Sequence, residues 1–273
     1  GARAAPGGGP RPSHRRLNVA VVAAWLESRT VLAALRRSLP RGSGGLLACR
    51  SRAALMRALR GRLVDAIVVT PRALKPGEVA EIIAAFPRVP IFAYASFRPD
   101  DGEVLAAFAR RGVPVLVEGV DDAAVGELVA RGSAQAERRR ALSDAPRLLR
   151  LRSPLQREVW TLLQGMVDRP LRTAELARRL RVTREHLSRQ FAVEAAPNLK
   201  RVIDLTRVAA AAQLLGNPGH TTARAAAILR FASAGHLDRT SRRITGVGAS
   251  RLGALGPGGA LEAFARGKTR SRV

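Results

Sequence analysis

Two stretches of the chain, 49 or 50 residues apart, repeat one arrangement of apolar, basic and short polar residues. The first runs from Leu171 to Phe191 as LRTAELARRLRVTREHLSRQF. Its Leu176 and Leu180 are four residues apart, and so are Leu187 and Phe191, which puts each pair on one side of a short helix. The spacing therefore predicts two short helices whose apolar stripes pack against each other.

The polar residues of the second predicted helix are suited to bind nucleic acid. Thr183 can cap its first turn, and Arg184, Glu185, Ser188 and Arg189 lie on the side away from the apolar stripe. Arginine and short polar side chains on an exposed helix donate to phosphates and to guanine O6 and N7 in the major groove. The pattern predicts a helix-turn-helix unit that binds DNA.

The same features return in a second unit. The matches are Leu176-Ala177 with Ala225-Ala226, Leu180 with Leu229, His186-Leu187 with His236-Leu237, and Arg189 with Arg239. Between the units, residues 199–215 read as one long helix with Asn198 as its N-cap. Two units on a rigid helix can enter successive major grooves, about 34 Å apart on one side of the duplex.

The region from about Leu155 to Leu252 resembles the AraC/XylS-type DNA-binding domain. The residues that carry the resemblance are the run LARRLRVTREHLSRQF and then Arg207, Ala211, Leu214-Leu215, Phe231, His236-Leu237, Arg239 and Gly246-Val247. The base-facing positions that the resemblance implies are Glu185, Ser188, Arg189, Ala234, Gly235, His236, Asp238 and Arg239. Near the helix ends, the residues expected to contact phosphates are Arg184, Lys200, Arg201, Arg242 and Arg243.

The second unit departs from the family pattern. The departures are Arg230 for a usual Gly, Leu237 and Ser241 at usually aromatic positions, and Ala249 for a usual Pro. We expect this unit to bury less apolar surface than the first. We also expect it mainly to hold the DNA backbone, while the first unit specifies bases. Asp238 would be repelled by phosphates unless Arg239, Arg242 or a cytosine amino group engages it.

The N-terminal half alternates short apolar runs with helical patterns. The apolar runs are LNVAVVA, LLACR, DAIVVT, VPIFAYA and VPVLVE, and each is followed by a helical pattern. This alternation predicts an α/β doubly wound domain, with a parallel sheet and helices on both faces. The pattern over residues 16–132 resembles a response-regulator receiver, which has the flavodoxin-like fold.

The residues that receivers use for phosphotransfer are missing. Such domains need acidic Mg²⁺ ligands after the first strand, an Asp at the end of the third, Thr or Ser after the fourth and Lys after the fifth. Here the first strand ends in Ala23-Ala24-Trp25, Thr70 ends the third, the fourth reaches Ala95-Ser96 and Glu118 replaces the Lys. A hard divalent cation needs several oxygen ligands. We expect a regulatory or dimerisation domain that is not phosphorylated.

Charge supports a polyanionic partner. The 273 residues include 47 Lys and Arg but only 21 Asp and Glu, and residues 153–253 alone hold 17 basic and 7 acidic residues. Nucleic acid is the usual partner for such an excess. The expected organisation is a disordered basic arm (1–15), the receiver-like domain (16–132), a basic linker (133–152), the AraC-type DNA-binding domain (153–252) and a flexible basic tail (253–273).

Other functions find little support in the sequence. A single cysteine, Cys49, excludes a disulfide framework, and the start of the chain lacks the apolar core of a signal peptide. The Gly267–Thr269 run GKT lacks the upstream Gly of a P-loop. We expect a bacterial, cytoplasmic transcription regulator without enzymatic activity, cofactor or metal, that binds double-stranded DNA and no membrane. A second copy of the chain and RNA polymerase are candidate partners.

Four alternatives stay open. The first is an interaction adaptor whose DNA-binding domain has decayed, and the second is a helical domain that makes only protein contacts. The third is a metal pair formed by His186 and His236, and the fourth is an enzyme with a small-molecule site at the carboxyl ends of the strands.

Overall fold

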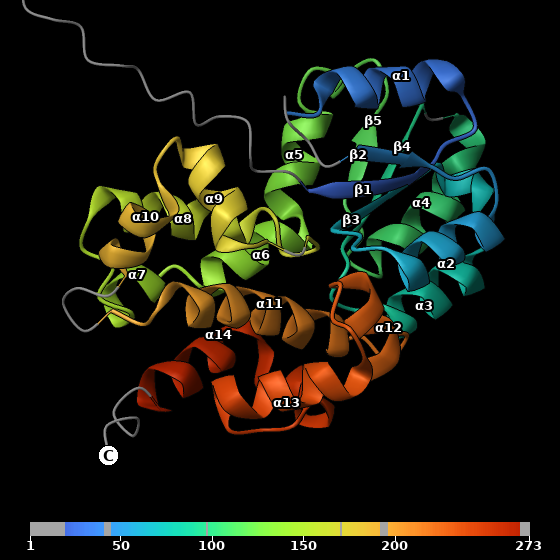
Figure 1. Ribbon diagram of the computed structural model, residues 1–273. Helices are drawn as coiled ribbons and strands as arrows, with labels where there is room; N and C mark the ends of the chain where they lie inside the picture. Colours follow the sequence, from blue (N-terminus) through green and yellow to red (C-terminus); the bar gives the residue numbers. More distant parts are fainter. Residues whose placement is uncertain (1–19, 41–44, 97, 170, 192–195, 268–273) are drawn as a thin grey trace, which may run out of the picture.

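The N-terminal domain is built on one parallel sheet, in a computed structural model that describes residues 20–40, 45–96, 98–169, 171–191 and 196–267 (Figure 1). The strands are β1 (Val21–Trp25), β2 (Gly45–Ala48), β3 (Ala66–Val69), β4 (Ile91–Ala95) and β5 (Val115–Val117). All pair in parallel, in the order β2-β1-β3-β4-β5. This is the flavodoxin-like order, with its switch point between β1 and β3, and it confirms the predicted fold class.

Helices cover both faces of the sheet because successive strand residues point to opposite sides. One face packs against α1 (Arg29–Ser38) and α5 (Val125–Gly132), and the other against α2 (Arg52–Gly61), α3 (Pro76–Ala85) and α4 (Gly102–Ala109). Val22 belongs to the first core and its neighbour Ala23 to the second. Two short 3₁₀ turns, η2 (Pro71–Ala73) and η3 (Pro99–Asp101), follow β3 and β4.

The described residues of the C-terminal half form helices joined by short turns, with no strand among them. Its helices are α6 (Ala134–Ala141), α7 (Ala145–Leu148), α8 (Pro154–Gln164), α9 (Thr173–Leu180), α10 (Arg184–Gln190), α11 (Leu199–Leu215), α12 (Thr222–Ile228), α13 (Ala234–Thr245) and α14 (Ala249–Gly267). The long helix α11 runs through the middle and is buried along most of its length (Figure 1). Among the described residues, no helix combines the length and apolar character that crossing a membrane requires.

The predicted flexible tail is wrong for residues 253–267, which form most of α14. This helix bends at Gly256, whose φ is 66°, just before Pro257. Beyond the bend, Leu261 and Phe264 lie three residues apart on one side of the helix and are buried. They join the core around α11, so this segment is part of the folded domain. Residues 268–273 and the predicted arm (1–15) lie outside the described residues.

The predicted basic linker, residues 133–152, here called the connector, packs against the rest of the protein. Ser133 caps α6 by accepting a hydrogen bond from Ala136 N (3.2 Å). Ala134, Arg138 and Leu142 follow one another at a spacing of four residues, and all three are buried. The predicted basic linker is thus partly helical, and one side of its helix α6 faces the protein interior.

Candidate nucleic-acid interface

The first helix-turn-helix unit consists of α9, a tight turn and α10. Arg181 ends α9 in the left-handed conformation, with φ 55°. The amide of Val182 then donates to the carbonyl of Ala177 (3.0 Å), which closes the turn. Thr183 caps α10 by accepting from His186 N (3.1 Å), as predicted from the sequence.

The second unit, α12 and α13, repeats this turn 49 residues later. Arg230 has φ 58°, Phe231 N donates to Ala226 O (2.8 Å), and Ser233 caps α13 by accepting from His236 N (3.1 Å). Arg230 thus takes the left-handed conformation that favours the glycine expected there. The repeat in the sequence is a repeat of backbone geometry.

The two second helices differ in how they expose the predicted base-facing residues. On α10, Leu187 is buried while Arg184, Glu185, Ser188 and Arg189 are exposed. On α13, Leu237 is buried, Gly235 and Arg239 are exposed, and Ala234, His236 and Asp238 are half-buried. Each unit therefore buries an apolar stripe and leaves an arginine on the opposite side.

Residues 176–253 match the protein family described as a helix-turn-helix domain. This segment is a helix-turn-helix domain of the AraC type. The matched residues begin in α9 and end in α14, so they include the second helix of the first unit, α11 and the whole second unit.

Comparison with other proteins adds little to the match. No curated protein matches the chain. A crystal structure of full-length FixJ from B. japonicum aligns with it at 15% identity, over 83% of this chain and 97% of that chain, with a TM-score of 0.38.

In the second unit of the AraC-type domain, buried hydroxyl groups form hydrogen bonds at the place where a large apolar side chain was expected. Ser241 is fully buried, and its hydroxyl donates to the carbonyl of Val247 (2.6 Å). The hydroxyl of Thr245, one turn later, donates to Ser241 O (2.9 Å). The buried polar groups are thus paired, as stability requires.

Arg207 connects the long helix α11 to the turn of the second unit. Its guanidinium carbon lies 3.8 Å from the centre of the Phe231 ring, and its Nη2 donates to Leu229 O (2.8 Å). Burial lowers the pKa of Arg207, while nearby Asp204 acts in the opposite direction. The cation therefore stacks on the ring and fixes the turn against α11.

Asp238 is engaged within the protein. Its Oδ2 accepts from Arg242 Nε (2.9 Å), and its Oδ1 accepts from Ala249 N (2.8 Å) at the start of α14. The hydrogen bonds from Arg242 and from the Ala249 amide lower the pKa of this carboxyl. Of the partners suggested from the sequence, Arg242 is the one in contact, whereas the cap on α14 was missed.

Some of the cations expected to contact phosphates are exposed, and others are engaged by groups of the protein itself. Lys200 is exposed, like Arg184, whereas Arg201 is half-buried with its guanidinium 4.8 Å from the centre of the Phe264 ring. Arg243 lies 2.7 Å from the carboxylate of Asp204 on α11. Asp204 could have been noticed as an acid on the apolar side of a helix, but the sequence does not identify its partner.

At the carboxyl end of β3, where a receiver would carry its phosphoacceptor Asp, this chain has a threonine. Thr70, at the end of β3, is buried, and its hydroxyl oxygen accepts from Glu27 N (3.3 Å). Beside it, Arg72 forms an ion pair with the buried Asp101. Among the described residues, no three His, Cys, Asp or Glu side chains are grouped to hold a metal ion.

Proposed function

We propose that the chain is a bacterial, cytoplasmic transcription regulator that reads specific DNA sequences and is not an enzyme. The observation that supports this proposal is that α10 and α13 each expose an arginine, Arg189 and Arg239. The two helices belong to repeated helix-turn-helix units that α11 joins. An exposed helix of this kind fits the major groove. Double-stranded DNA is the proposed partner, and a second copy of the chain and RNA polymerase remain candidates.

Selection from a pool of random duplexes tests this proposal. We expect enrichment of one sequence with two parts about one helical turn apart, because the two units are joined by one helix. Competition with a scrambled duplex then measures specificity. Equal binding of selected and scrambled duplexes would favour an interaction adaptor with a decayed DNA-binding domain.

The two exposed arginines are expected to act differently. Arg189→Ala should cost about 1–3 kcal/mol of binding and relax the preference at one or two base pairs. Arg239→Ala should weaken binding more evenly across sequences, because the second unit is proposed mainly to hold the backbone. Affinities for a panel of single-base variants of the selected duplex measure both effects.

A matched control is Arg36→Ala, which removes an exposed arginine from α1 of the N-terminal domain. It should leave the whole panel unchanged. The opposite result, in which Arg239→Ala erases the sequence preference and Arg189→Ala keeps it, would mean that the roles of the two units are reversed.

The N-terminal domain is proposed to work without phosphorylation. The buried Thr70 stands where the acceptor Asp would be, and its hydroxyl is engaged by a backbone amide. Incubation with acetyl phosphate and Mg²⁺ should leave both the mass and the oligomeric state of the protein unchanged. Stoichiometric labelling that disappears in Thr70→Ala would contradict this expectation.

A further inference from the structure

The N-terminal domain packs directly against the corner between α11 and α12, residues 216–220, where the second unit begins. At this corner Gly219 N donates to the carbonyl of Ala85 at the end of α3 (2.7 Å). The rings of Phe86 and His220 meet edge to face, with centroids 5.3 Å apart. Burial, together with Arg224, lowers the pKa of His220 to about 4, so this ring is neutral near pH 7.

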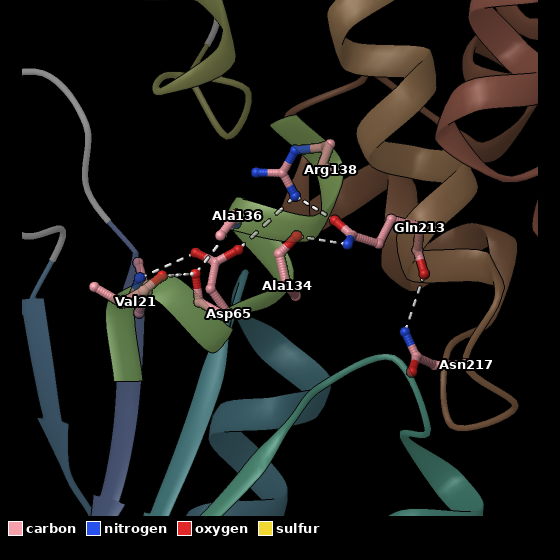
Figure 2. A network of polar contacts seen from close by, with 9 residues as sticks. Val21, Asp65, Ala134, Ala136, Arg138, Gln213 and Asn217 are labelled. Atoms are coloured by element: carbon pink, nitrogen blue, oxygen red, sulfur yellow. Dashed lines mark hydrogen bonds and ion pairs between the residues drawn. The ribbon is translucent and has the colours of Figure 1, made fainter. Parts of the chain in front are cut away.

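A buried network of polar contacts joins the same two parts through the connector helix α6 (Figure 2). At the sheet, Asp65 accepts from Val21 N (3.0 Å) and lies 3.8 Å from the guanidinium of Arg138. Arg138 also donates to the side chain of Gln213 on α11, whose amide donates to Ala134 O (2.7 Å). Arg138 therefore contacts the N-terminal domain and the AraC-type domain at once.

Asn217 carries the network to the docked corner. Its side-chain nitrogen donates to the carbonyls of Gln213 and Leu214 (both 3.1 Å). Its side-chain oxygen accepts from Arg88 N (2.8 Å), between α3 and β4. The chain of contacts thus starts at the sheet, crosses α6 and α11, and returns to the N-terminal domain.

The polar groups of this network are buried, which favours one arrangement of the two domains. Asp65 and Arg138 are each only 1% exposed, as is Asn217. Burial raises the pKa of Asp65, and the Arg138 guanidinium opposes that rise. Sliding of the AraC-type domain past the N-terminal domain would break the buried hydrogen bond from Arg138 to Gln213 and the one from Arg88 N to Asn217. Buried polar groups that lose their partners are costly, so the two domains have little freedom to slide.

Docking leaves the surfaces proposed to meet DNA uncovered. Gly235 and Arg239 on α13, and Ser188 and Arg189 on α10, are exposed with both domains in contact. The docked arrangement is therefore compatible with DNA binding. It fixes the end of α11 from which α12 and α13 start.

We propose that Arg138 is a positioning residue: through it the docked N-terminal domain holds the 216–220 corner and sets the direction in which the second unit meets DNA. This inference rests on the proposed function. The N-terminal domain then contributes to recognition by contact with the second unit, with no phosphorylation required.

The first test uses Gly219→Ala, which disturbs the docked corner without changing any charge. A Cβ at this position would lie 2.6 Å from two atoms of the Phe86 ring and 2.9 Å from the Ala85 carbonyl oxygen. The corner, the Phe86 ring or the Ala85 carbonyl must then shift, which loosens the docked contact. The matched control is Gly61→Ala at the end of α2, where a Cβ would meet no atom within 4 Å.

The second test removes Arg138. Arg138→Gln leaves the Asp65 carboxyl buried without its cation, so this variant could fail to fold. The double variant Asp65→Asn with Arg138→Gln removes both charges together, which costs less than removing one. Circular dichroism checks that each variant keeps its helices.

Hydrogen exchange measures docking directly, at the amides of Arg88 and Gly219 that donate across the interface. We expect exchange there to rise by about tenfold or more in Gly219→Ala and in the double variant, while amides of α9 and α10 stay protected. Gly61→Ala should behave as the wild type. Continued protection in the double variant would show that Arg138 does not hold the interface.

Footprinting on the selected duplex measures the consequence for DNA. We expect the undocked variants to lose about tenfold in affinity and to lose protection of the half-site bound by the second unit, with the other half-site still protected. A complete footprint in an undocked variant would overturn the inference. If the wild type prefers no sequence, the proposed function fails and this inference with it, whereas the exchange data still report whether Arg138 docks the domains.

Discussion

Phe264→Ala is expected to lower the free energy of unfolding by about 3–5 kcal/mol, the usual cost of removing a buried aromatic ring. Phe264 is fully buried, and its ring lies beneath the guanidinium of Arg201 on α11. Its helix, α14, packs along α11, the central element of the AraC-type domain. Loss of the ring would leave a cavity in this core. Urea unfolding followed by circular dichroism measures the change.

Glu262→Ala is the matched control on the same helix. Glu262 is exposed, so its replacement should change the free energy of unfolding by no more than about 0.5 kcal/mol. Equal midpoints for Phe264→Ala and the wild type would mean that residues 253–267 do not pack as the structure has them and that the expected flexible tail was correct.

The sequence predicts this fold well where a regular spacing repeats. The four-residue spacing of Leu176 and Leu180, and its return 49 residues later, located both helix-turn-helix units. The five apolar runs of the N-terminal half likewise predicted a parallel sheet that is covered on both faces. In these segments local preference and tertiary packing point to the same structure.

Prediction fails where the partner of a residue is distant in the chain. Gly256 and Pro257 are typical of loops, so the sequence predicts a tail where Leu261 and Phe264 form the apolar side of a helix. Arg138 stands in a run of three arginines, and composition cannot say which of them is buried. The missed signal is its four-residue spacing from Ala134 and Leu142, which puts an arginine on an apolar side.

DNA affinity is expected to fall steeply as salt rises. Each neutralised phosphate adds roughly −0.9 to the slope of log affinity against log salt concentration. The candidates are Arg184, Lys200, Arg201, Arg242 and Arg243. Three to five such contacts give a slope of about −2.7 to −4.5, or roughly a 40- to 500-fold loss between 50 and 200 mM salt. Fluorescence anisotropy with the selected duplex measures it.

Single-lysine variants show whether the slope comes from the AraC-type domain. Lys200 is exposed at the start of α11, so Lys200→Ala should make the slope shallower by about one if it meets a phosphate. Lys75→Ala removes an exposed lysine from the N-terminal domain and should leave the slope unchanged. Scrambled duplexes should show the same shift, because phosphate contacts carry no sequence information. A wild-type slope shallower than about −2 would contradict groove binding by both units, since two phosphates already account for that value.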